Sequence, residues 1–290
     1  MPELQTLRPH EKDLGGGFVV RRLLPAAARQ AVGPFVFFDH FGPITVQPGD
    51  NFDVRPHPHI GLATVTYLFE GAMMHRDSTG VVRRIEPGAV NLMVAGRGIV
   101  HSERAPDDLR GKPYRNHGLQ LWLAVPTERE EDAPAFQHVP SANIPSLQVD
   151  GVDVRVLIGT AFGLTSPVQP VSPTLYVNLN FPTTPSAGIV IPDAAEERAL
   201  YSTDAPFELD GVSMPAHTMV VLEPGSHPLL RAGGGAHVVL IGGAPLGHRF
   251  MVWNFVSSRK ERIVQAQDDW AAQRFERVPG ETEFIPLPPR

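Results

Sequence analysis

The sequence predicts an all-β protein with one α-helix near its C-terminal end. Segments rich in β-branched and aromatic residues, such as Phe35–Phe41 and Leu62–Gly71, recur along the chain, and such segments favour strands. Clusters of Gly, Pro, Asp and Asn separate them at the short intervals that are typical of an all-β sandwich or barrel. The 27 glycines and 30 prolines among the 290 residues interrupt helices and punctuate short strands.

The expected strands fall into two groups of similar size. The first group is Phe18–Leu24, Phe35–Phe41, Leu62–Gly71, Val81–Ile85, Ala89–Gly96 and Gly118–Val125. The second group is Val152–Gly159, Thr174–Phe181, Phe207–Gly211, Thr218–Gly225 and Ala236–Gly243. A charged segment and the connector Pro140–Pro145 separate the groups. The sequence therefore predicts two β-domains of ordinary size, over residues 1–135 and 145–290.

The single expected helix lies in the last forty residues of the chain. Ser258 and Glu261 have the spacing of a capping box, in which each side chain satisfies a free backbone N–H of the first turn. The apolar residues that follow on one helical face are Ile263, Ala266 and Trp270. We expect the helix to end near Phe275, and the proline-rich tail after it to lie extended across a domain surface.

Composition excludes several classes of protein and of site. The formal charge of -6 argues against a nucleic-acid partner, because such proteins present a basic face. The chain has no cysteine, so disulfides and thiolate metal sites are excluded. It also has no signal-like N-terminal segment and no apolar run of about 18 residues. We expect a soluble, cytoplasmic protein with no membrane partner.

Two short motifs carry the chemistry that the sequence suggests. His57 and His59 stand two residues apart, and so do His101 and Glu103. Side chains two residues apart on a strand point to the same face. If the two strands face each other, three imidazoles and one carboxylate meet at one point. This ligand set suits a divalent first-row metal and leaves coordination positions open for substrate or dioxygen.

These histidines also have a less specific interpretation, as residues without a metal. A lone H-x-H motif is common in loops, and most of the 12 histidines are expected to be solvated or core residues. Two motifs, both within strand-like sequence, are a much stronger signal than either alone. We expect Asp39, His40 and Gln120 to line the substrate pocket or to orient a ligand. Asp39 could equally cap a turn, and Trp122 is expected in the core.

Several segments resemble the pirin family of the cupin superfamily. They are RPHPHIGLATVTYLFEG, HRDSTG, MVAGRGIVHSE, GPFVFFDHFGP and GLQLWLAVP, and the resemblance covers nearly the whole chain. In general cupins three or four residues separate H-x-H from a glutamate, whereas Ala63 and Thr64 stand at the corresponding positions of this chain. Glu103 replaces that glutamate, as in the pirin pattern. The segment PLGHRFMVWNFVSS departs from many pirins and indicates a variant subfamily.

The resemblance implies a bicupin, which is a pair of face-to-face β-barrels of the double-stranded β-helix type. It implies metal ligands at His57, His59, His101 and Glu103. Iron(II) is the first choice, and manganese, nickel, copper, cobalt or zinc are alternatives. The C-terminal half has no H-x-H or H-x-E, so we expect its barrel to lack a metal.

The resemblance implies two rival functions. One is a quercetin 2,3-dioxygenase-like oxidoreductase, in which an aromatic or enol-ketone substrate and O2 meet the metal and Glu103 acts as the catalytic base. The other is a metal-dependent regulator that binds a protein partner, for which the acidic run EREED could supply a surface. A metal that only stabilises the barrel is a third possibility.

Overall fold

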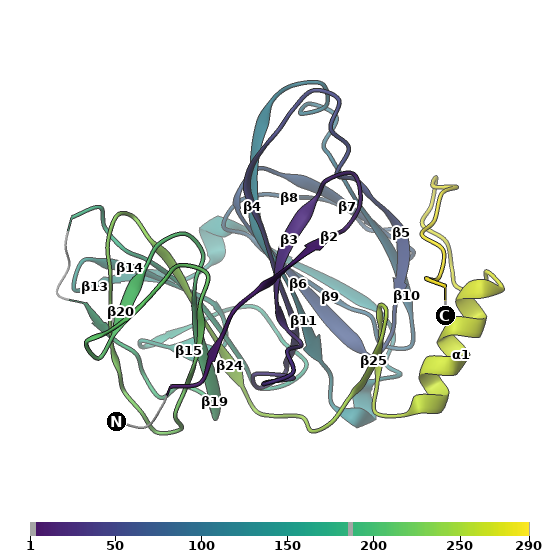
Figure 1. The fold of residues 1–290 in the computed structure, drawn as a ribbon. Helices are drawn as coiled ribbons and strands as arrows, with labels where there is room; N and C mark the ends of the chain where they lie inside the picture. Colours follow the sequence, from purple (N-terminus) through teal and green to yellow (C-terminus); the bar gives the residue numbers. More distant parts are fainter. Residues whose placement is uncertain (1–3, 185–187, 290) are drawn as a thin grey trace. The chain divides into compact units, whose positions relative to one another are not determined.

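The computed structural model describes residues 4–184 and 188–289, which form mainly short antiparallel strands (Figure 1). Within these ranges the chain has 26 β-strands, one α-helix, and two 3₁₀ turns at Thr127–Arg129 and Ser141–Asn143. The predicted fold class, all-β with one C-terminal helix, is therefore confirmed.

Contacts within the chain group it into two compact units, and each unit draws segments from distant parts of the sequence. Unit 1 comprises Met1–Glu11, Arg21–Asp39 and Ala142–Pro245, and unit 2 comprises Lys12–Val20, His40–Ser141 and Leu246–Arg290. The C-terminal helix thus groups with strands of the first half, although the sequence assigned it to residues 145–290. The expected boundaries, 1–135 and 145–290, stay a prediction about which segments fold independently.

Unit 1 is organised around a seven-stranded sheet with an apolar core. The strands of this sheet lie in the order β1 (Thr6–Leu7), β22 (Met219–Leu222), β19 (Glu197–Ser202), β24 (His237–Gly243), β17 (Thr174–Asn180), β14 (Val152–Ile158) and β13 (Ser146–Val149). A second sheet has the order β18 (Ile189–Val190), β23 (Leu229–Ala232), β20 (Phe207–Leu209) and β21 (Val212–Met214), and β15 (Thr160–Ala161) pairs with β16 (Leu164–Thr165). Alternate side chains such as Val154, Val177 and Leu240 are fully buried and form the core.

Unit 2 contains the sheet that carries both chemical motifs. This four-stranded sheet has the order β5 (Val54–His59), β10 (Ile99–Arg104), β7 (Met73–Asp77) and β8 (Val82–Ile85). A seven-stranded sheet has the order β12 (Ala135–Val139), β9 (Val90–Val94), β6 (Leu62–Glu70), β11 (Tyr114–Ala124), β4 (Phe35–Val46), β3 (Val19–Leu24) and β2 (His10–Asp13). Its strands β12, β9, β6 and β11 lie wholly in unit 2. The hairpin of β25 (Phe250–Val252) and β26 (Phe255–Ser257) comes from the last fifty residues.

The helix α1 (Lys260–Ala271) confirms one sequence-based prediction and overturns another. Ile263, Ala266 and Trp270 are its buried residues, as their spacing predicts. The predicted capping box is wrong, because Arg259 is the N-cap and no side chain caps the helix. The hydroxyl of Ser258 instead donates a hydrogen bond to Glu130, 3.0 Å away. The helix also ends at Ala271 rather than near Phe275.

The acidic run EREED anchors the segment that precedes α1. Glu130 is buried and accepts hydrogen bonds from the hydroxyl of Ser257 (2.9 Å) and the backbone N–H of Ser258 (2.9 Å). Glu131 forms ion pairs with Arg259 (2.8 Å) and Arg262 (3.0 Å). Two of its carboxylates are thus engaged inside unit 2, which weakens the case for the run as a partner surface.

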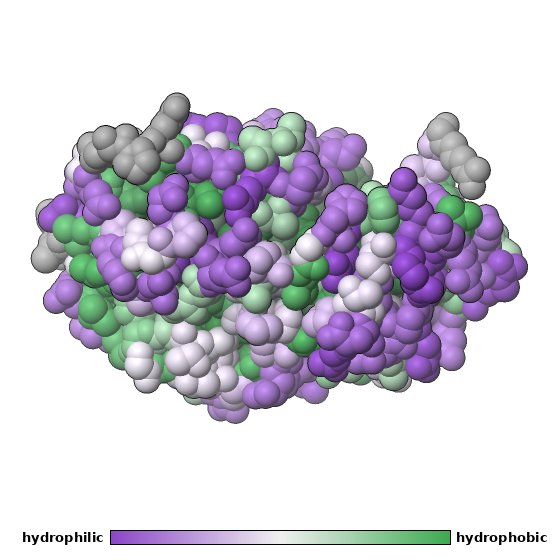
Figure 2. Space-filling view, turned by 90° about the horizontal axis from the view of Figure 1, so that it is seen from below, coloured by the Kyte–Doolittle hydropathy of each residue, from purple (hydrophilic) through white to green (hydrophobic). Residues whose placement is uncertain are grey.

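The surface mixes polar and apolar residues. Figure 2 shows hydrophilic and hydrophobic residues interspersed on the face that it draws. Among the residues that the structure describes, no helix combines the length and the apolar character needed to cross a membrane.

Candidate metal centre

The pairing of β5 with β10 brings the two histidine motifs together. His101 lies directly opposite His57, and Ile99 lies opposite His59 in this antiparallel pair. Because side chains alternate along a strand, the three histidines share one face, and each is at most 7 % exposed. The two histidine motifs therefore lie on paired strands, as a shared metal site requires.

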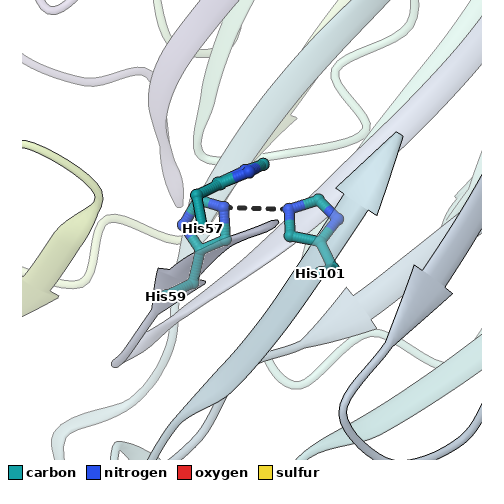
Figure 3. Close-up of side chains that lie close together, drawn as sticks. All are labelled: His57, His59 and His101. Atoms are coloured by element: carbon teal, nitrogen blue, oxygen red, sulfur yellow. Dashed lines mark hydrogen bonds between the residues drawn. The ribbon is translucent and has the colours of Figure 1, made fainter. Parts of the chain in front are cut away.

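The three imidazoles converge tightly enough to hold one ion. Each offers a ring nitrogen, and the three nitrogens lie within 4.8 Å of one another. The Nε2 atoms of His59 and His101 are 3.1 Å apart. Figure 3 shows the three rings turned toward a common point from β5 and β10, with this contact dashed. His57 and His101 are also close, with ring centroids 4.3 Å apart.

Backbone carbonyls fix the orientation of two of these rings. The Nδ1 atom of His57 donates to the carbonyl of Arg55, 2.9 Å away, and that of His59 donates to the carbonyl of Asn254, 3.1 Å away. A proton on Nδ1 leaves Nε2 as the atom with a lone pair. Nδ1 of His101 is buried and has no hydrogen-bond partner among the residues that the structure describes.

The hairpin β25–β26 reaches the centre through a close backbone contact. The backbone carbonyl of Ile60 accepts a hydrogen bond from the N–H of Val256 (3.2 Å), which lies in β26 just after the turn that supplies the Asn254 carbonyl. Gly61 has φ of 63°, and a Cβ at this position would lie 2.1 Å from the carbonyl oxygen of Val256. Only glycine fits this approach. The segment PLGHRFMVWNFVSS therefore contributes directly to the orientation of His59.

Burial keeps the three imidazoles uncharged. It lowers the pKa of His57 to about 4, although the hydrogen bond to Arg55 acts in the opposite direction. Burial, together with the neighbouring imidazoles, lowers the pKa values of His59 and His101 well below the ordinary value. Neutral imidazole is the form that binds a metal, so these residues fit a divalent ion.

Glu103 lies on the same strand as His101 and on the same face, but outside the group of three nitrogens. Gln120 donates a hydrogen bond to its Oε1 atom over 3.3 Å, and Thr66 donates to the carbonyl oxygen of Gln120 over 2.7 Å. Burial raises the pKa of Glu103 to about 7. Thr66 thereby fixes the side-chain amide of Gln120 with its NH2 group toward the carboxylate of Glu103. Gln120, which was expected in the pocket, thus contacts Glu103, which was predicted as a metal ligand.

A second buried pair lies beside the centre on β7. Asp77 is opposite His101 and His75 is opposite Glu103 in the β7–β10 register. His75 donates from Nε2 to Asp77 over 2.9 Å, and its ring stacks on Phe136 at 4.5 Å. This pair was not among the residues predicted for the site. The i, i+2 spacing of HRD, identical to that of the two ligand motifs, was the signal that could have found it.

The remaining predicted residues have different partners. Asp39 is buried in unit 1 and accepts two hydrogen bonds of 2.8 Å from Arg22. His40 in unit 2 is buried and lies 2.9 Å from His117, measured between their Nε2 atoms. Trp122 is buried, as expected of a core residue, and its ring meets that of His59 edge-on at 5.1 Å.

Comparison with known families matches both halves of the chain. The family model described as Pirin matches residues 17–123, and the model described as Pirin C-terminal cupin domain matches residues 176–276. A "Pirin-like protein" of Caulobacter vibrioides is 46% identical over 282 residues, which are 96% of each chain.

Solved structures give the same fold. A quercetin 2,3-dioxygenase from Acinetobacter baumannii matches with a TM-score of 0.91 and 35% identity, over 99% of this chain and 95% of that one. A bacterial pirin from Escherichia coli, solved in complex with nickel(II), matches with a TM-score of 0.65 and 16% identity, over 84% of this chain and 100% of that one. By these matches the bicupin fold is confirmed, and the chain belongs to the pirin family.

Proposed function

We propose that this pirin-family protein is a metal-dependent dioxygenase that cleaves flavonol-type, enol-ketone substrates with O2. The observation that carries the proposal is the convergence of three buried, neutral imidazoles beside a carboxylate with a raised pKa. The match to a quercetin 2,3-dioxygenase supports the choice of substrate class. In this proposal His57, His59 and His101 hold the metal, with Glu103 as the fourth ligand.

Glu103 is the residue assigned to proton transfer. A general base works best when its pKa lies near the working pH, and the pKa of Glu103 is about 7. Gln120 donates to one carboxylate oxygen, so the side chain stays aimed when the proton from the substrate hydroxyl arrives. Thr66 prevents the amide of Gln120 from flipping, because a flipped amide would turn its oxygen toward the carboxylate.

The histidines and their neighbours supply the setting for the reaction. A bound divalent ion would add Lewis acidity toward the substrate oxygens and a site for dioxygen. The buried ring of Trp122 meets that of His59 edge-on, so an apolar side chain borders this ligand. Carboxylates exchange between binding modes more readily than imidazoles, and this allows Glu103 to carry a proton while three histidines retain the ion.

The test is oxygen uptake with quercetin after reconstitution with iron, manganese, nickel or copper. Wild type should consume oxygen with at least one metal, and Glu103→Ala should be slower by about 10²–10⁴-fold, the usual contribution of a general base. Glu86→Ala is the matched control, because Glu86 is an exposed carboxylate of the same unit. Uptake with none of the metals would reject the dioxygenase and favour a regulatory protein that binds a partner. Full activity of Glu103→Ala would reject the role of Glu103.

A further inference from the structure

The pairing of β5 and β10 is interrupted at the metal centre itself. His57 is opposite His101 and Val54 is opposite Glu103, so two residues of β5, Arg55 and Pro56, face one residue of β10. This is a β-bulge, and a bulge breaks the regular hydrogen-bond ladder and re-aims side chains. The bulge lies between two predicted ligands on β10, so its shape controls how His101 and Glu103 are placed relative to each other.

Groups outside the ladder satisfy both carbonyls on the β5 side of the bulge. The carbonyl of Arg55 accepts from the ring of His57. The carbonyl of Pro56 accepts from the N–H of Ile285, 2.8 Å away. Ile285 belongs to the C-terminal tail, residues 276–289, which lies beside β5 and β10 in Figure 1. Trp270 on α1 in turn donates from Nε1 to the carbonyl of Ile285 over 2.9 Å.

One tail carboxylate engages the β10 side of the bulge. Ser102 and Arg104 flank Glu103 and point away from the imidazoles, because side chains alternate along the strand. The hydroxyl of Ser102 donates to Oε1 of Glu281 over 2.5 Å, and Nη2 of Arg104 donates to Oε2. Glu281 therefore holds both neighbours of Glu103 from the outer face of the strand.

The contact of Glu281 is more enclosed than the other acidic contacts of the tail. The side chain of Glu281 is 9 % exposed, whereas that of Glu283, which reaches only Arg104, is 57 % exposed. Enclosed charge-assisted hydrogen bonds are stronger than exposed ion pairs, which water and salt screen. The two glutamates thus form a matched pair, one partly buried at the bulge and one exposed at the surface.

We propose that Glu281 is a positioning residue of the metal centre, which sets the β-bulge and through it the reach of Glu103. Glu281 acts through its hydrogen bonds to Ser102 and Arg104, on the strand that carries the ligands. The tail is then part of the site, because Glu281 and Ile285 complete the hydrogen bonding of opposite sides of one bulge. This inference rests on the proposed metal site and adds a residue from the far end of the chain.

The experiment measures cobalt(II) absorption and the rate of metal release to a chelator, on the full chain. Glu281→Gln removes the ion pair with Arg104 but keeps an acceptor for Ser102, and Glu281→Ala removes both. We expect altered ligand-field bands and release that is faster by about 10-fold for Glu281→Gln, since outer-shell partners contribute 10–100-fold to metal affinity. The effect should be larger for Glu281→Ala, while Glu283→Gln should match wild type.

Three outcomes separate the failure of this inference from that of the proposed function. If wild type shows no cobalt bands at all, the proposed metal site fails. If wild type binds cobalt and Glu281→Gln has the same bands and release rate, the positioning role is wrong, even if the variant melts at a lower temperature. If Glu283→Gln changes the bands as much as Glu281→Gln, the effect is one of surface charge and the inference is likewise overturned.

Discussion

A divalent ion can be held by imidazoles only when their protons have been removed from the atoms that face it. In this chain burial is the main cause of this deprotonation, because it lowers the pKa values of all three site histidines. Glu103 responds to the same environment in the opposite direction, and its pKa rises to about 7. One set of surroundings therefore yields neutral imidazoles and a carboxyl group that gains or loses its proton near neutral pH.

We predict that the histidines and Glu103 differ in how much metal binding depends on them. His101→Ala should lower metal affinity by at least about 100-fold, because it removes a ligand rather than a supporting contact. Glu103→Ala should retain most of the metal, since three imidazoles remain. Metal content after dialysis measures both, with the exposed His227→Ala as the control. Retention of full metal content by His101→Ala would contradict the ligand assignment.

Metal binding should also release a proton, and the release should depend on pH in a known direction. Below pH 7 the carboxyl group of Glu103 is mostly protonated in the metal-free protein, because its pKa is raised to about 7. Binding to an ion then expels close to one proton one pH unit below that value and very little one unit above it. His57 contributes nothing at either pH, since its pKa is about 4.

Calorimetric titration in two buffers of different ionisation enthalpy measures this release. Glu103→Gln should abolish the difference between the two buffers at the lower pH. Equal proton release above and below pH 7, or an unchanged value in Glu103→Gln, would show that Glu103 is not a ligand.

At the scale of elements, α1 packs on the strands that carry the site. Ile60 at the end of β5 and Val100 in β10 belong to the same buried cluster as Ile263 and Trp270 of α1. The helix is therefore part of the support of β5 and β10, and its indole N–H also fixes the tail at Ile285.

Trp270→Ala should destabilise the protein by about 3–5 kcal/mol, the usual cost of removing a large buried aromatic side chain. Val264→Ala on the same helix is the control, because Val264 is 51% exposed and should change stability by no more than about 0.5 kcal/mol. Chemical denaturation monitored by tryptophan fluorescence and by circular dichroism measures both variants. Equal effects of the two substitutions would show that the helix is not a structural support of this unit.

At the scale of the whole molecule, the two units are assembled from interleaved segments of the chain. The cluster of three imidazoles lies in unit 2. A ligand stabilises the folded state that binds it by an amount that grows with its concentration. Metal should therefore protect the protein against heat through unit 2.

Chelation should lower the melting temperature measured by scanning calorimetry, and readdition of metal should restore it. At a free metal concentration one hundred times the dissociation constant, the gain is about 2.7 kcal/mol. His101→Ala is the control and should show no dependence on metal. If neither chelator nor added metal changes the melting temperature of the wild type, the site does not bind an ion in the folded protein.

Local sequence patterns predicted most of the fold because they report burial at short range. The expected strands correspond to observed ones, for example Leu62–Gly71 to β6 and Thr174–Phe181 to β17. The apolar face of α1 was predictable for the same reason. The capping box failed because Ser258 and Glu130 are distant in sequence, and a buried carboxylate competed for the hydroxyl that a helix start would have used.

The candidate site was predictable only where its spacing is local. The spacing of H-x-H and of H-x-E predicts that the two side chains of each motif share one face of a strand, and the structure brings the three histidines together. Contacts such as Glu281 with Ser102, or Gln120 with Glu103, join residues whose neighbourhood depends on sheet topology. No periodicity in the sequence encodes such pairs, so the support of the site could be read only from the structure.

The hydrogen bond between His59 and Asn254 joins residues 195 positions apart, and this separation bears on the order of events during synthesis. At the usual 5–20 residues per second, about 10–40 s pass between the synthesis of His59 and that of Asn254. During this interval the imidazole has no carbonyl to fix its tautomer, and the tail is not yet made. The carbonyl that orients His59 is therefore present only after Asn254 has been synthesised, well after the three imidazoles themselves.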